Sequence, residues 1–379
     1  MTICSRCMID AGHGVDMDSF GICSYCRLIE GFPWIISRIG SSEDVLSQRL
    51  GLFQDQGKYD CIVGLSGGKD SSYIVYLLKT KYNARVLTFT LDNGFLTGYA
   101  RDNIESIVRG FCVDHIWVRP EKDIQRRLYA VNLNKECWPC SACVHMGETS
   151  IWKLAYEHRV PFIISGRTPE QILRRPSREL MRQEDSLLFD NFSGYDRGRV
   201  LKMAVQTLQR IKLEKRWLFG DHEKPLQENI SLYPTDNTIA SDDFAPEYLA
   251  FFLYEKHDEI KMMETLERNT SWRNPEKKGL LSHLDCTAHD AAGYLYYRRH
   301  KVPFIGLEIS ALVRLNQMSK EQARGIYLDE IDSLSAYPEE SINALASVSG
   351  ISPHEIRMLP EKIRIKRYVK DRIKKIVGR

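Results

Sequence analysis

Residues 59–72 read YDCIVGLSGGKDSS. The apolar run 61–65 predicts a buried parallel strand, and an apolar helical pattern resumes at Tyr73. Between them, two adjacent glycines give the backbone conformations that are closed to other residues. They also let phosphate oxygens approach the N–H groups at the positive end of the following helix. The stretch therefore predicts a strand, a glycine turn and a helix that together bind an anion.

Lys69 follows the second glycine directly, so this is not the common nucleotide loop GxxxxGK[ST]. It resembles SGGxDS, the signature of the PP-loop ATP pyrophosphatases, which cleave ATP between the α- and β-phosphates and transfer AMP to an oxygen of the substrate. The resemblance implies a doubly wound parallel α/β sheet of the adenine nucleotide alpha-hydrolase type. The alternative is a glycine turn that binds no ligand.

The resemblance implies that ATP and Mg²⁺ bind at the loop, with contacts from Leu65, Ser66, Gly67, Gly68, Lys69, Asp70, Ser71 and Ser72. Departing pyrophosphate needs donors, which the N–H groups of both glycines, the hydroxyls of Ser66 and Ser71, and Lys69 supply. Asp70 organises magnesium or the loop, because a carboxylate beside phosphates is costly without a cation. We take Ser66, Lys69, Asp70 and Ser71 as the catalytic residues.

Further strands are expected at 84–91, 114–118 and 161–165, with a helix around 100–109. Doubly wound sheets bind ligands at the carboxyl ends of their strands. Thr90, Leu91 and Asp92 are therefore candidates to line an adenosine site, unless Asn93-Gly94 is only a turn. Gly166-Arg167-Thr168 resembles the GxT segment that approaches the α-phosphate in PP-loop enzymes, and the alternative is a solvated turn.

Two CxxC pairs, Cys4/Cys7 and Cys23/Cys26, lie at the amino terminus. This spacing suits a tetrahedral zinc ion that staples a segment too small to hold its own core. Four thiolates leave no position for substrate, so we expect a structural Zn²⁺ site. A nucleic-acid-binding zinc ribbon is the other interpretation, and the lack of a Lys/Arg cluster around these pairs counts against it.

Three further cysteines, Cys137, Cys140 and Cys143, lead into a helix expected at 147–158. A fourth ligand, Cys286, lies in a Ser-His-Leu-Asp-Cys element that contains His283 and Asp285. Cysteines this close usually share a metal or do redox chemistry, although buried inert thiols remain the alternative. We predict a second Zn²⁺ or a [4Fe–4S] cluster, since the stretch resembles the cluster site of some tRNA-thiolating PP-loop enzymes.

The chain has 379 residues, 43% hydrophobic and 27% charged, which is ordinary for a globular protein. No run of about 18 apolar residues and no signal-peptide pattern is present, so we expect a cytoplasmic protein without a membrane span. The net charge is +3, yet the segment 361–379 alone carries nine basic residues against two acidic ones. The net charge of that segment is therefore +7, and the net charge of the remaining chain is −4.

We expect three parts: a zinc knuckle at 1–30, a PP-loop domain at 31–230, and a mainly helical substrate or partner region at 231–379 that ends in a basic amphipathic helix. A helical linker is expected at 28–57. A charged helical stretch that suits a lid or partner surface is expected at 174–216, and a substrate loop or boundary at 232–246. Helices are expected at 288–300, 308–324 and 339–347.

Most of the chain resembles the N-acetyl sugar amidotransferases of surface-polysaccharide (lipopolysaccharide O-antigen) and nonulosonic-acid pathways. The shared features are the two CxxC pairs with an MxD between them, SGGKDSS, CxxCxxC, SHxDC and a Met318-Ser319-Lys320-Glu321 stretch, whereas residues 299–308 match little. The resemblance implies that ATP adenylates the acetamido oxygen of a free or nucleotide-linked N-acetyl sugar, and that ammonia replaces it to give an acetamidino sugar.

Ammonia requires a source, but no glutaminase triad is recognisable and Thr2, not a cysteine, follows Met1. The resemblance implies a separate partner, like the glutaminase and cyclase of histidine biosynthesis. The strongest rival function is tRNA thiolation, which the basic tail favours. The acidic remainder and the lack of a recognisable RNA-binding module oppose RNA as a partner. A non-catalytic, zinc-stabilised adaptor is a further alternative.

Overall fold

The computed structural model describes residues 2–33, 36–37, 39–52, 57–176, 244, 246–274 and 285–359. At its centre is a parallel sheet in the order β3-β2-β1-β4-β5. Its strands are β1 (Cys61–Gly64), β2 (Val86–Leu91), β3 (Asp114–Val118), β4 (Phe162–Ser165) and β5 (Glu247–Ala250). The predicted doubly wound parallel sheet is confirmed, and the first four strands lie where the sequence places them.

Strand β1 is central. The chain first builds outward through β2 to β3, then crosses back to place β4 and β5 on the other side of β1. The direction of winding therefore reverses between β1 and β4. In open α/β sheets this switch point leaves a crevice beyond the carboxyl ends of the two strands. The glycine loop (residues 65–71) and Gly166 both follow these ends.

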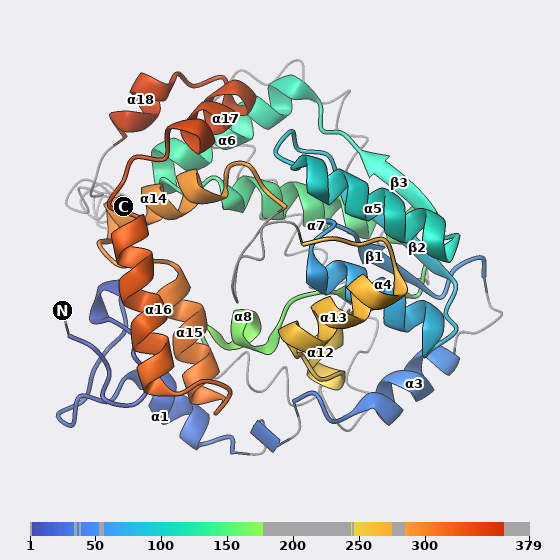
Figure 1. Cartoon of the computed structure of the whole chain (residues 1–379), viewed down its shortest axis with the longest axis horizontal. Coiled ribbons are helices and arrows are strands. Elements are labelled where there is room, and N and C mark those ends of the chain that lie inside the picture. Colours follow the sequence, from blue (N-terminus) through green and yellow to red (C-terminus); the bar gives the residue numbers. More distant parts are fainter. Residues whose placement is uncertain are drawn as a thin grey trace, which may run out of the picture.

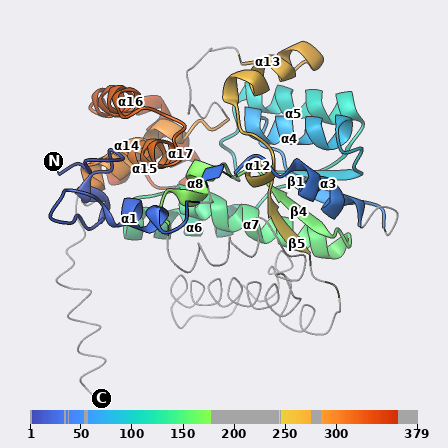
Figure 2. The ribbon, with the colours of Figure 1, turned by 90° about the horizontal axis from the view of Figure 1, so that it is seen from below.

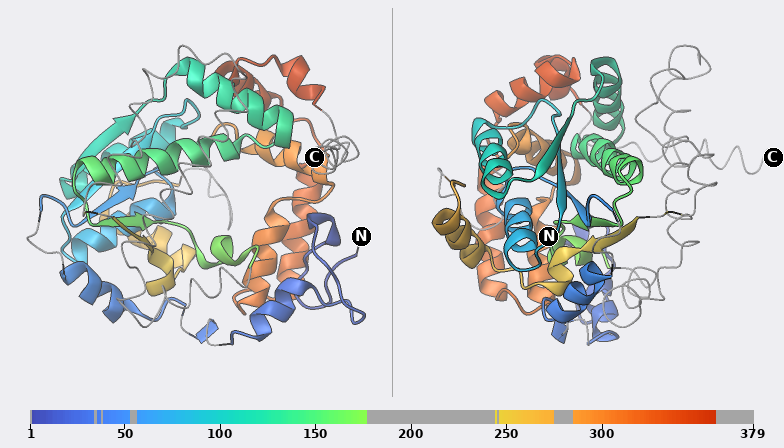
Figure 3. Two further views of the ribbon diagram at one scale, coloured as in Figure 1. Left: turned by 180° about the vertical axis from the view of Figure 1, so that it is seen from behind. Right: turned by 90° about the vertical axis from the view of Figure 1, so that its right-hand side faces the viewer.

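Helices cover both faces of the sheet (Figure 3). Helices α4 (Lys69–Thr80) and α5 (Gly98–Phe111) lie on one face, and α7 (Cys140–Glu157) crosses the other. Alternate residues of β1 enter the two cores: Cys61 and Val63 pack with α4, whereas Ile62 packs with Leu154 of α7. Burial on both faces accounts for the continuous apolar run in the sequence.

Strand β5 comes from the range that we expected to be helical, and it pairs with β4 through the register Phe162↔Glu247. The following helices α12 (Phe251–Tyr254) and α13 (Glu259–Asn269) stay beside the sheet. Helix α13 packs on α4, as Figure 2 shows. Residues 247–274 thus form one wall around the glycine loop.

The remaining helices build the other side of the molecule (Figure 1). Helices α6 (Lys122–Glu136), α14 (His289–His300), α17 (Glu339–Ser349) and α18 (Pro353–Arg357) share one apolar core. The expected helix at 308–324 is two helices, α15 (Ile305–Arg314) and α16 (Lys320–Ser333). Asn316 has a positive φ of 57°, and Ser319 begins α16 with a capping box. The mainly helical C-terminal part is confirmed.

The amino-terminal segment contains a short 3-10 helix, η1 (Ala11–His13), and α1 (Ser24–Glu30). It packs on α15 and α16, where Leu307 joins the cysteine core and Met8 contacts the cluster around Tyr327. The expected helical linker contains α3 (Glu43–Gly51), whose Leu46 and Leu50 are buried. Segments from opposite ends of the sequence therefore lie side by side.

Several expectations concern residues outside those that the structure describes. They are the charged stretch beyond Pro176, most of the loop at 232–246, Phe53, His283 and the basic tail. Within the described part, no helix has both the length and the apolar character that crossing a membrane requires.

Candidate active site

The glycine loop turns the chain from β1 into α4. Gly67 has a φ of +81°, and a Cβ built on it would lie 2.2 Å from the carbonyl oxygen of Ala100. Only glycine fits such a position. Gly68 is the N-cap of α4 and offers no side-chain acceptor to the first turn. The start of this helix is therefore suited to accept an anion.

The loop is held from outside by two side chains. The carbonyl oxygen of Gly67 accepts hydrogen bonds from Trp272 Nε1 at 2.9 Å and from Asn103 Nδ2 at 3.1 Å. Asn103 Oδ1 in turn accepts from the backbone N–H of Arg273 at 2.9 Å. The carbonyl oxygen of Gly67 thus points away from the anion site, and both of its acceptor positions are occupied by these hydrogen bonds.

The two loop hydroxyls lie together. Ser66 Oγ and Ser71 Oγ are 3.3 Å apart, and the backbone N–H of Ser66 donates to Ser71 Oγ at 3.1 Å. Both residues line the cavity described below. The structure therefore brings these two predicted catalytic hydroxyls to one point at the carboxyl end of β1.

A buried charge network lies beside the loop. Lys69 Nζ is 3.4 Å from Asp70 Oδ2 and 3.3 Å from a carboxylate oxygen of Glu259. Burial by itself lowers the pKa of Lys69, but these two carboxylates outweigh burial and raise it. Lys69 therefore stays charged at neutral pH, as a group that binds phosphate must be.

His257 lies behind Asp70, with Nε2 2.8 Å from Asp70 Oδ1. Burial raises the pKa of Asp70, but the hydrogen bond from His257 and the charge of Lys69 lower it below its usual value. Glu170, in α8 (Pro169–Leu173), also interacts with His257, and burial raises the pKa of this glutamate. Its Oε2 has no hydrogen-bond partner among the described residues.

A cavity of about 280 Å³ opens over the loop. One side is formed by residues 66–71 and Gly166, at the switch point of the sheet. The other side carries polar and aromatic groups from α5 and the wall at 247–274, namely Tyr99, Asn103, Glu259, Trp272, Arg273 and Asn274. We call this space the loop cavity.

A second cavity of about 260 Å³ lies at the ends of β1 and β2. Most of its lining is apolar: Leu65, Phe89, Leu91, Phe95 and Leu96, with Thr90, Asn93 and Cys286. We call it the apolar cavity. The two cavities share Gly64, Ser66 and Asp285, so they meet beside the first residue of the SGG sequence.

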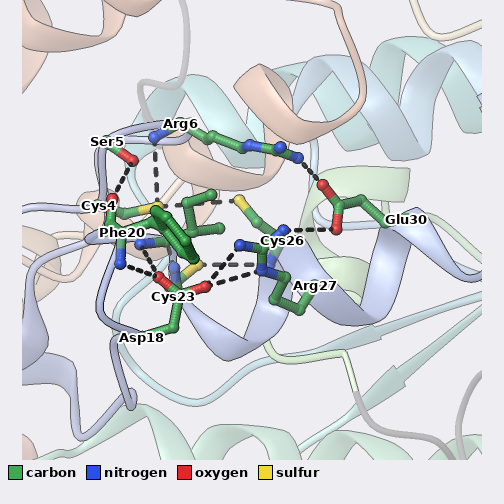
Figure 4. Close-up of polar contacts among 10 residues, drawn as sticks. Cys4, Ser5, Arg6, Asp18, Phe20, Cys23, Cys26, Arg27 and Glu30 are labelled. Carbon is green, nitrogen blue, oxygen red and sulfur yellow. Dashed lines mark hydrogen bonds and ion pairs between the residues drawn. The ribbon is translucent and has the colours of Figure 1, made fainter.

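The four amino-terminal cysteines form a candidate metal centre, and Figure 4 labels three of them, Cys4, Cys23 and Cys26. The sulfurs of Cys4, Cys7, Cys23 and Cys26 all lie within 4.8 Å of one another, with Cys4–Cys26 at 3.9 Å and Cys7–Cys23 at 3.6 Å. Zinc–sulfur bonds of about 2.3 Å in a tetrahedron separate the sulfurs by about 3.8 Å. The observed separations therefore fit one tetrahedral metal ion.

The burial of these thiols also favours a cation. All four cysteines are buried, and they lie close enough to share one ion. Four buried thiolates cannot coexist without a positive charge between them. The donor set and its burial thus fit Zn²⁺, as the sequence predicts, and Cys4, Cys7, Cys23 and Cys26 would hold it.

Arg314 connects this centre to the sheet domain. Its Nη1 lies 3.3 Å from Cys7 Sγ, and its Nη2 donates to the carbonyl oxygen of Leu173 at 3.0 Å. Leu173 is the last residue of α8, which follows Gly166 and contributes Gln171 to the lining of the loop cavity. A buried arginine therefore ties a cysteine ligand to the segment that leads out of the active site.

Cys140, Cys143 and Cys286 are brought together although 143 positions separate the last two. Burial, and then the proximity of Cys143 and Cys286, raises the pKa of the Cys140 thiol, and burial together with the proximity of Cys143 raises the pKa of Cys286 to about 12. Cys143 Sγ lies 3.0 Å from the Tyr129 hydroxyl. Among the described residues only the amino-terminal set meets the 4.8 Å spacing, so this trio is wider than a single-zinc site.

Cys137 makes different contacts from the other three cysteines of the predicted second set. Its Sγ accepts a hydrogen bond from Arg299 Nη1 at 3.1 Å, and its side chain is buried in the core of α6 and α14. Cys137 thus differs in its contacts from the other members of the predicted second set, and a role for it as a ligand stays a prediction.

No family model matches this chain. A relative of 21% identity over 304 residues is an uncharacterized protein of Methanocaldococcus jannaschii, with 80% of this chain and 84% of that protein covered. Among solved structures, the U34-tRNA thiolase NcsA of Methanococcus maripaludis, with its [4Fe–4S] cluster, is 15% identical and covers 89% of both chains at a TM-score of 0.34.

The NH3-dependent NAD synthetase of Campylobacter jejuni is also 15% identical, with 54% of this chain and 97% of that one covered at a TM-score of 0.29. NMN synthetase of Francisella tularensis is 12% identical, with 69% of this chain and 95% of that one covered at a TM-score of 0.26. The chain's own strand order, β3-β2-β1-β4-β5, and the glycine loop at its switch point form the doubly wound parallel α/β fold that the sequence predicts.

The other predicted ATP contacts occupy varied places. Thr90 and Leu91 line the apolar cavity, and Gly166 lines the loop cavity. Asp92 instead pairs with Arg101 at 2.8 Å and with Arg119 at 3.1 Å. Contacts of ATP with Asp92 stay a prediction.

The remaining three predicted contacts, Ser72, Arg167 and Thr168, line neither cavity. The guanidinium of Arg167 pairs with Glu148 of α7. Thr168 caps α8, and Ser72 is buried without a hydrogen-bond partner for its hydroxyl among the described residues. Roles for these three in ATP binding stay predictions.

Sequence reasoning did not place Asn103, His257, Glu259 or Trp272 at the site. No motif in the sequence singles them out, because each is an ordinary residue in a helix or loop. Trp272 and His257 reach the loop across 205 and 187 positions. Only the packing of α13 on α4 brings them there.

Proposed function

We propose that this chain is an ATP-dependent, AMP- and pyrophosphate-forming amidotransferase. It adenylates the acetamido oxygen of a free or nucleotide-linked N-acetyl sugar, and ammonia then replaces that oxygen to give an acetamidino sugar. The observation that carries the adenylation step is the meeting of the two cavities at Gly64, Ser66 and Asp285. An apolar site for adenosine and an anion loop for phosphates then face each other across one point, where the α-phosphate would lie.

The chain's own groups account for the leaving of pyrophosphate. The N–H groups of Gly67 and Gly68 face the β- and γ-phosphates, and Lys69 neutralises their charge. Removing one such donor costs about 10²–10³ in rate in well-studied enzymes. Asp70 would hold Mg²⁺ against the phosphates, and the metal would supply further charge neutralisation.

The acceptor would enter from the polar side of the loop cavity. Tyr99, Arg273 and Asn274 line that side and offer the aromatic and hydrogen-bonding groups that a sugar requires. An amide oxygen is a poor leaving group, and its transfer to AMP makes it a good one. The choice of an N-acetyl sugar rests on the resemblance of the motifs, as does a separate glutaminase pair that supplies ammonia.

An oxygen-tracing experiment tests this function. The protein is supplied with ATP, Mg²⁺, ammonium and nucleotide-linked N-acetyl sugars that carry ¹⁸O in the acetamido group. We expect pyrophosphate, an amidine product and AMP that contains the ¹⁸O. Ser66→Ala and Asp70→Asn should fold normally and lose about 10²–10³ in rate. Amidine formed with unlabelled AMP, or undiminished rates in both variants, would contradict the proposal.

A second candidate function is tRNA thiolation, and the grouping of Cys140, Cys143 and Cys286 is the observation that favours it. Cys286 also lines the apolar cavity, so the trio lies next to the adenylation site. The three thiolates would hold a [4Fe–4S] cluster, which is larger than one zinc ion and would offer an open iron to sulfide. RNA retained through a high-salt wash and sulfur transfer to tRNA would favour this function.

The adaptor alternative makes a different prediction. A non-catalytic protein would consume no ATP with any N-acetyl sugar or any tRNA. Pyrophosphate release is therefore the measurement that separates both enzymes from an adaptor.

A further inference from the structure

Arg273 is a cation of the loop cavity that no described carboxylate neutralises. Among the described residues that line this cavity, Lys69 and Arg273 are the basic side chains. Lys69 Nζ is already paired with Asp70 at 3.4 Å and with Glu259 at 3.3 Å. Arg273 forms no ion pair with any residue that the structure describes, and its Nη1 donates to the carbonyl oxygen of Trp272 at 3.0 Å. Its Nε and Nη2, which form the other edge of the guanidinium, therefore stay available to a ligand.

The lining of the loop cavity is short of positive charge for a polyphosphate. Its described acidic side chains are those of Asp70, Glu259 and Asp285, so the formal charges of the lining leave one negative charge in excess. The β- and γ-phosphates of ATP would add more negative charge, and like charges repel strongly where water is excluded. Mg²⁺ at Asp70 would offset part of this repulsion. A guanidinium without a carboxylate partner is suited to offset the rest.

The backbone of Arg273 is fixed against the glycine loop. Its N–H donates to Asn103 Oδ1 at 2.9 Å, while Asn103 Nδ2 donates to the carbonyl oxygen of Gly67 at 3.1 Å. The preceding residue, Trp272, is buried and donates from Nε1 to the same carbonyl oxygen at 2.9 Å. One carbonyl of the loop therefore anchors both neighbours of the arginine side chain. This fixed frame lowers the cost of ordering Arg273 when an anion binds.

The place of Arg273 favours the outer phosphates of ATP over AMP. Arg273 lines the loop cavity but not the apolar cavity, which we assign to adenosine. The cavities meet at Gly64, Ser66 and Asp285, where the α-phosphate would lie, and Arg273 is not among these shared residues. The part of ATP that contacts both the loop and Arg273 is therefore the pair of phosphates that leaves.

We propose that Arg273 binds the β- and γ-phosphates opposite the glycine loop and stabilises pyrophosphate as it leaves. This inference rests on the proposed function, in which Tyr99 and Asn274 remain for the acceptor. The acceptor oxygen attacks the α-phosphorus, and the bond from the α-phosphorus to the bridging oxygen breaks. Pyrophosphate keeps that oxygen and the bonding electron pair. The free edge of the guanidinium donates two parallel hydrogen bonds to its oxygens, which is the geometry that arginine favours with phosphate.

Separate binding of the two products tests this role. Dissociation constants of pyrophosphate with Mg²⁺, and of AMP, are measured by equilibrium dialysis on the full chain. In Arg273→Met we expect pyrophosphate to bind about 10–100-fold more weakly, because hydrogen bonds between charged groups are lost, and AMP to bind as in the wild type. Arg273→Lys keeps the charge but not the planar fork and should fall between the two.

A matched control removes the same charge elsewhere. Arg268→Met changes an exposed arginine of α13 that lines neither cavity, and it should bind both ligands as the wild type does. Arg273 is itself exposed, so its replacement removes no core packing. Normal AMP binding by Arg273→Met reports that the variant has folded.

Two results would overturn the role of Arg273. One is an unchanged pyrophosphate affinity in Arg273→Met. The other is an equal loss of pyrophosphate affinity in Arg268→Met, which would show that net charge and not position controls binding. Failure of the proposed function gives a different result: a wild-type protein that binds pyrophosphate through Arg273 but forms no amidine from any N-acetyl sugar would reject the sugar reaction and leave this role intact.

Discussion

His257 Nε2 lies 2.8 Å from Asp70 Oδ1, so the aspartate of the glycine loop is held from behind by a residue of the segment between α12 and α13. Phe252 packs edge-on against the imidazole at 4.7 Å between ring centroids. The pair joins the loop to the wall at 247–274. Disturbing either residue should therefore affect the geometry of the phosphate site.

The His257–Asp70 pair predicts a pH-dependent stability. Burial lowers the pKa of His257, but Asp70, Glu170 and Glu259 outweigh burial and raise it above 6.5. The contribution of His257 is therefore full below about 6.5 and is lost as the pH rises through its raised pKa. The contribution of Asp70, whose pKa is lowered, is full above about 4 and is lost as the pH falls through that pKa.

Comparison of wild type with His257→Gln checks this. Unfolding free energies measured without nucleotide and Mg²⁺ should differ most between about pH 4 and pH 6.5 and converge at alkaline pH. The substitution His354→Gln, at an exposed histidine, serves as the matched control. A difference between wild type and His257→Gln that stays constant with pH would show that the ion pair does not form.

Gly67→Ala should distort the glycine loop more than one added methyl group would at another position. The new methyl group would lie 2.2 Å from the Ala100 carbonyl oxygen, at a φ of +81° that costs an alanine about 1–2 kcal/mol even without the clash. Gly110→Ala, in α5 with open space around its Cβ, should instead stabilise by about 0.5–1 kcal/mol. ATP affinity and denaturant unfolding measure both, and equal affinities would argue against an anion site at this loop.

Cys23→Ala should remove zinc and lower the melting temperature together, because the free energy of metal binding is part of the folding free energy of the knuckle. Cys61→Ala is the control: it truncates a buried thiol of β1 and should lower stability while zinc content stays at the wild-type level. Full zinc occupancy in Cys23→Ala would contradict the four-cysteine site.

Cys286→Ser tests the second cysteine set. If Cys140, Cys143 and Cys286 share a metal, anaerobically purified Cys286→Ser should lose it and stop the transfer step, while ATP still binds at the glycine loop. The exposed Cys112→Ser should keep both metal and activity. Unchanged metal content with normal transfer would leave a buried thiol as the role of Cys286.

The sequence predicts those parts of the site whose signals are local. The apolar run of β1, the paired glycines and the apolar face of α4 are contiguous, and the CxxC pairs each form one turn, so their geometry follows from neighbouring residues. The ends of β2 and β4 could be located because parallel strands present their carboxyl ends at one edge.

The remaining parts depend on packing. Strand β5 has only four residues, Glu247–Ala250, and its sequence lacks the β-branched residues that mark a strand. Arg167, a predicted phosphate contact, pairs with Glu148 of α7, an interaction that depends on the packing of α7 and not on neighbouring residues. The positions of His257 and Trp272 follow from the contact of α13 with α4. No periodicity in the sequence predicts that contact.

The docking of the cysteine knuckle on α15 and α16 has a consequence for the order of synthesis. The ligands Cys4 to Cys26 leave the ribosome about three hundred residues before Leu307, Arg314 and Tyr327 exist to cover them. The nascent knuckle therefore lacks this apolar cover while the sheet domain is made, and a metal bound by its four thiolates would be its main source of stability. Only the arrival of α15 closes the apolar side of the knuckle and, through Arg314, fixes the end of α8. A segment translated well before α15 is thus among the last to reach its final environment.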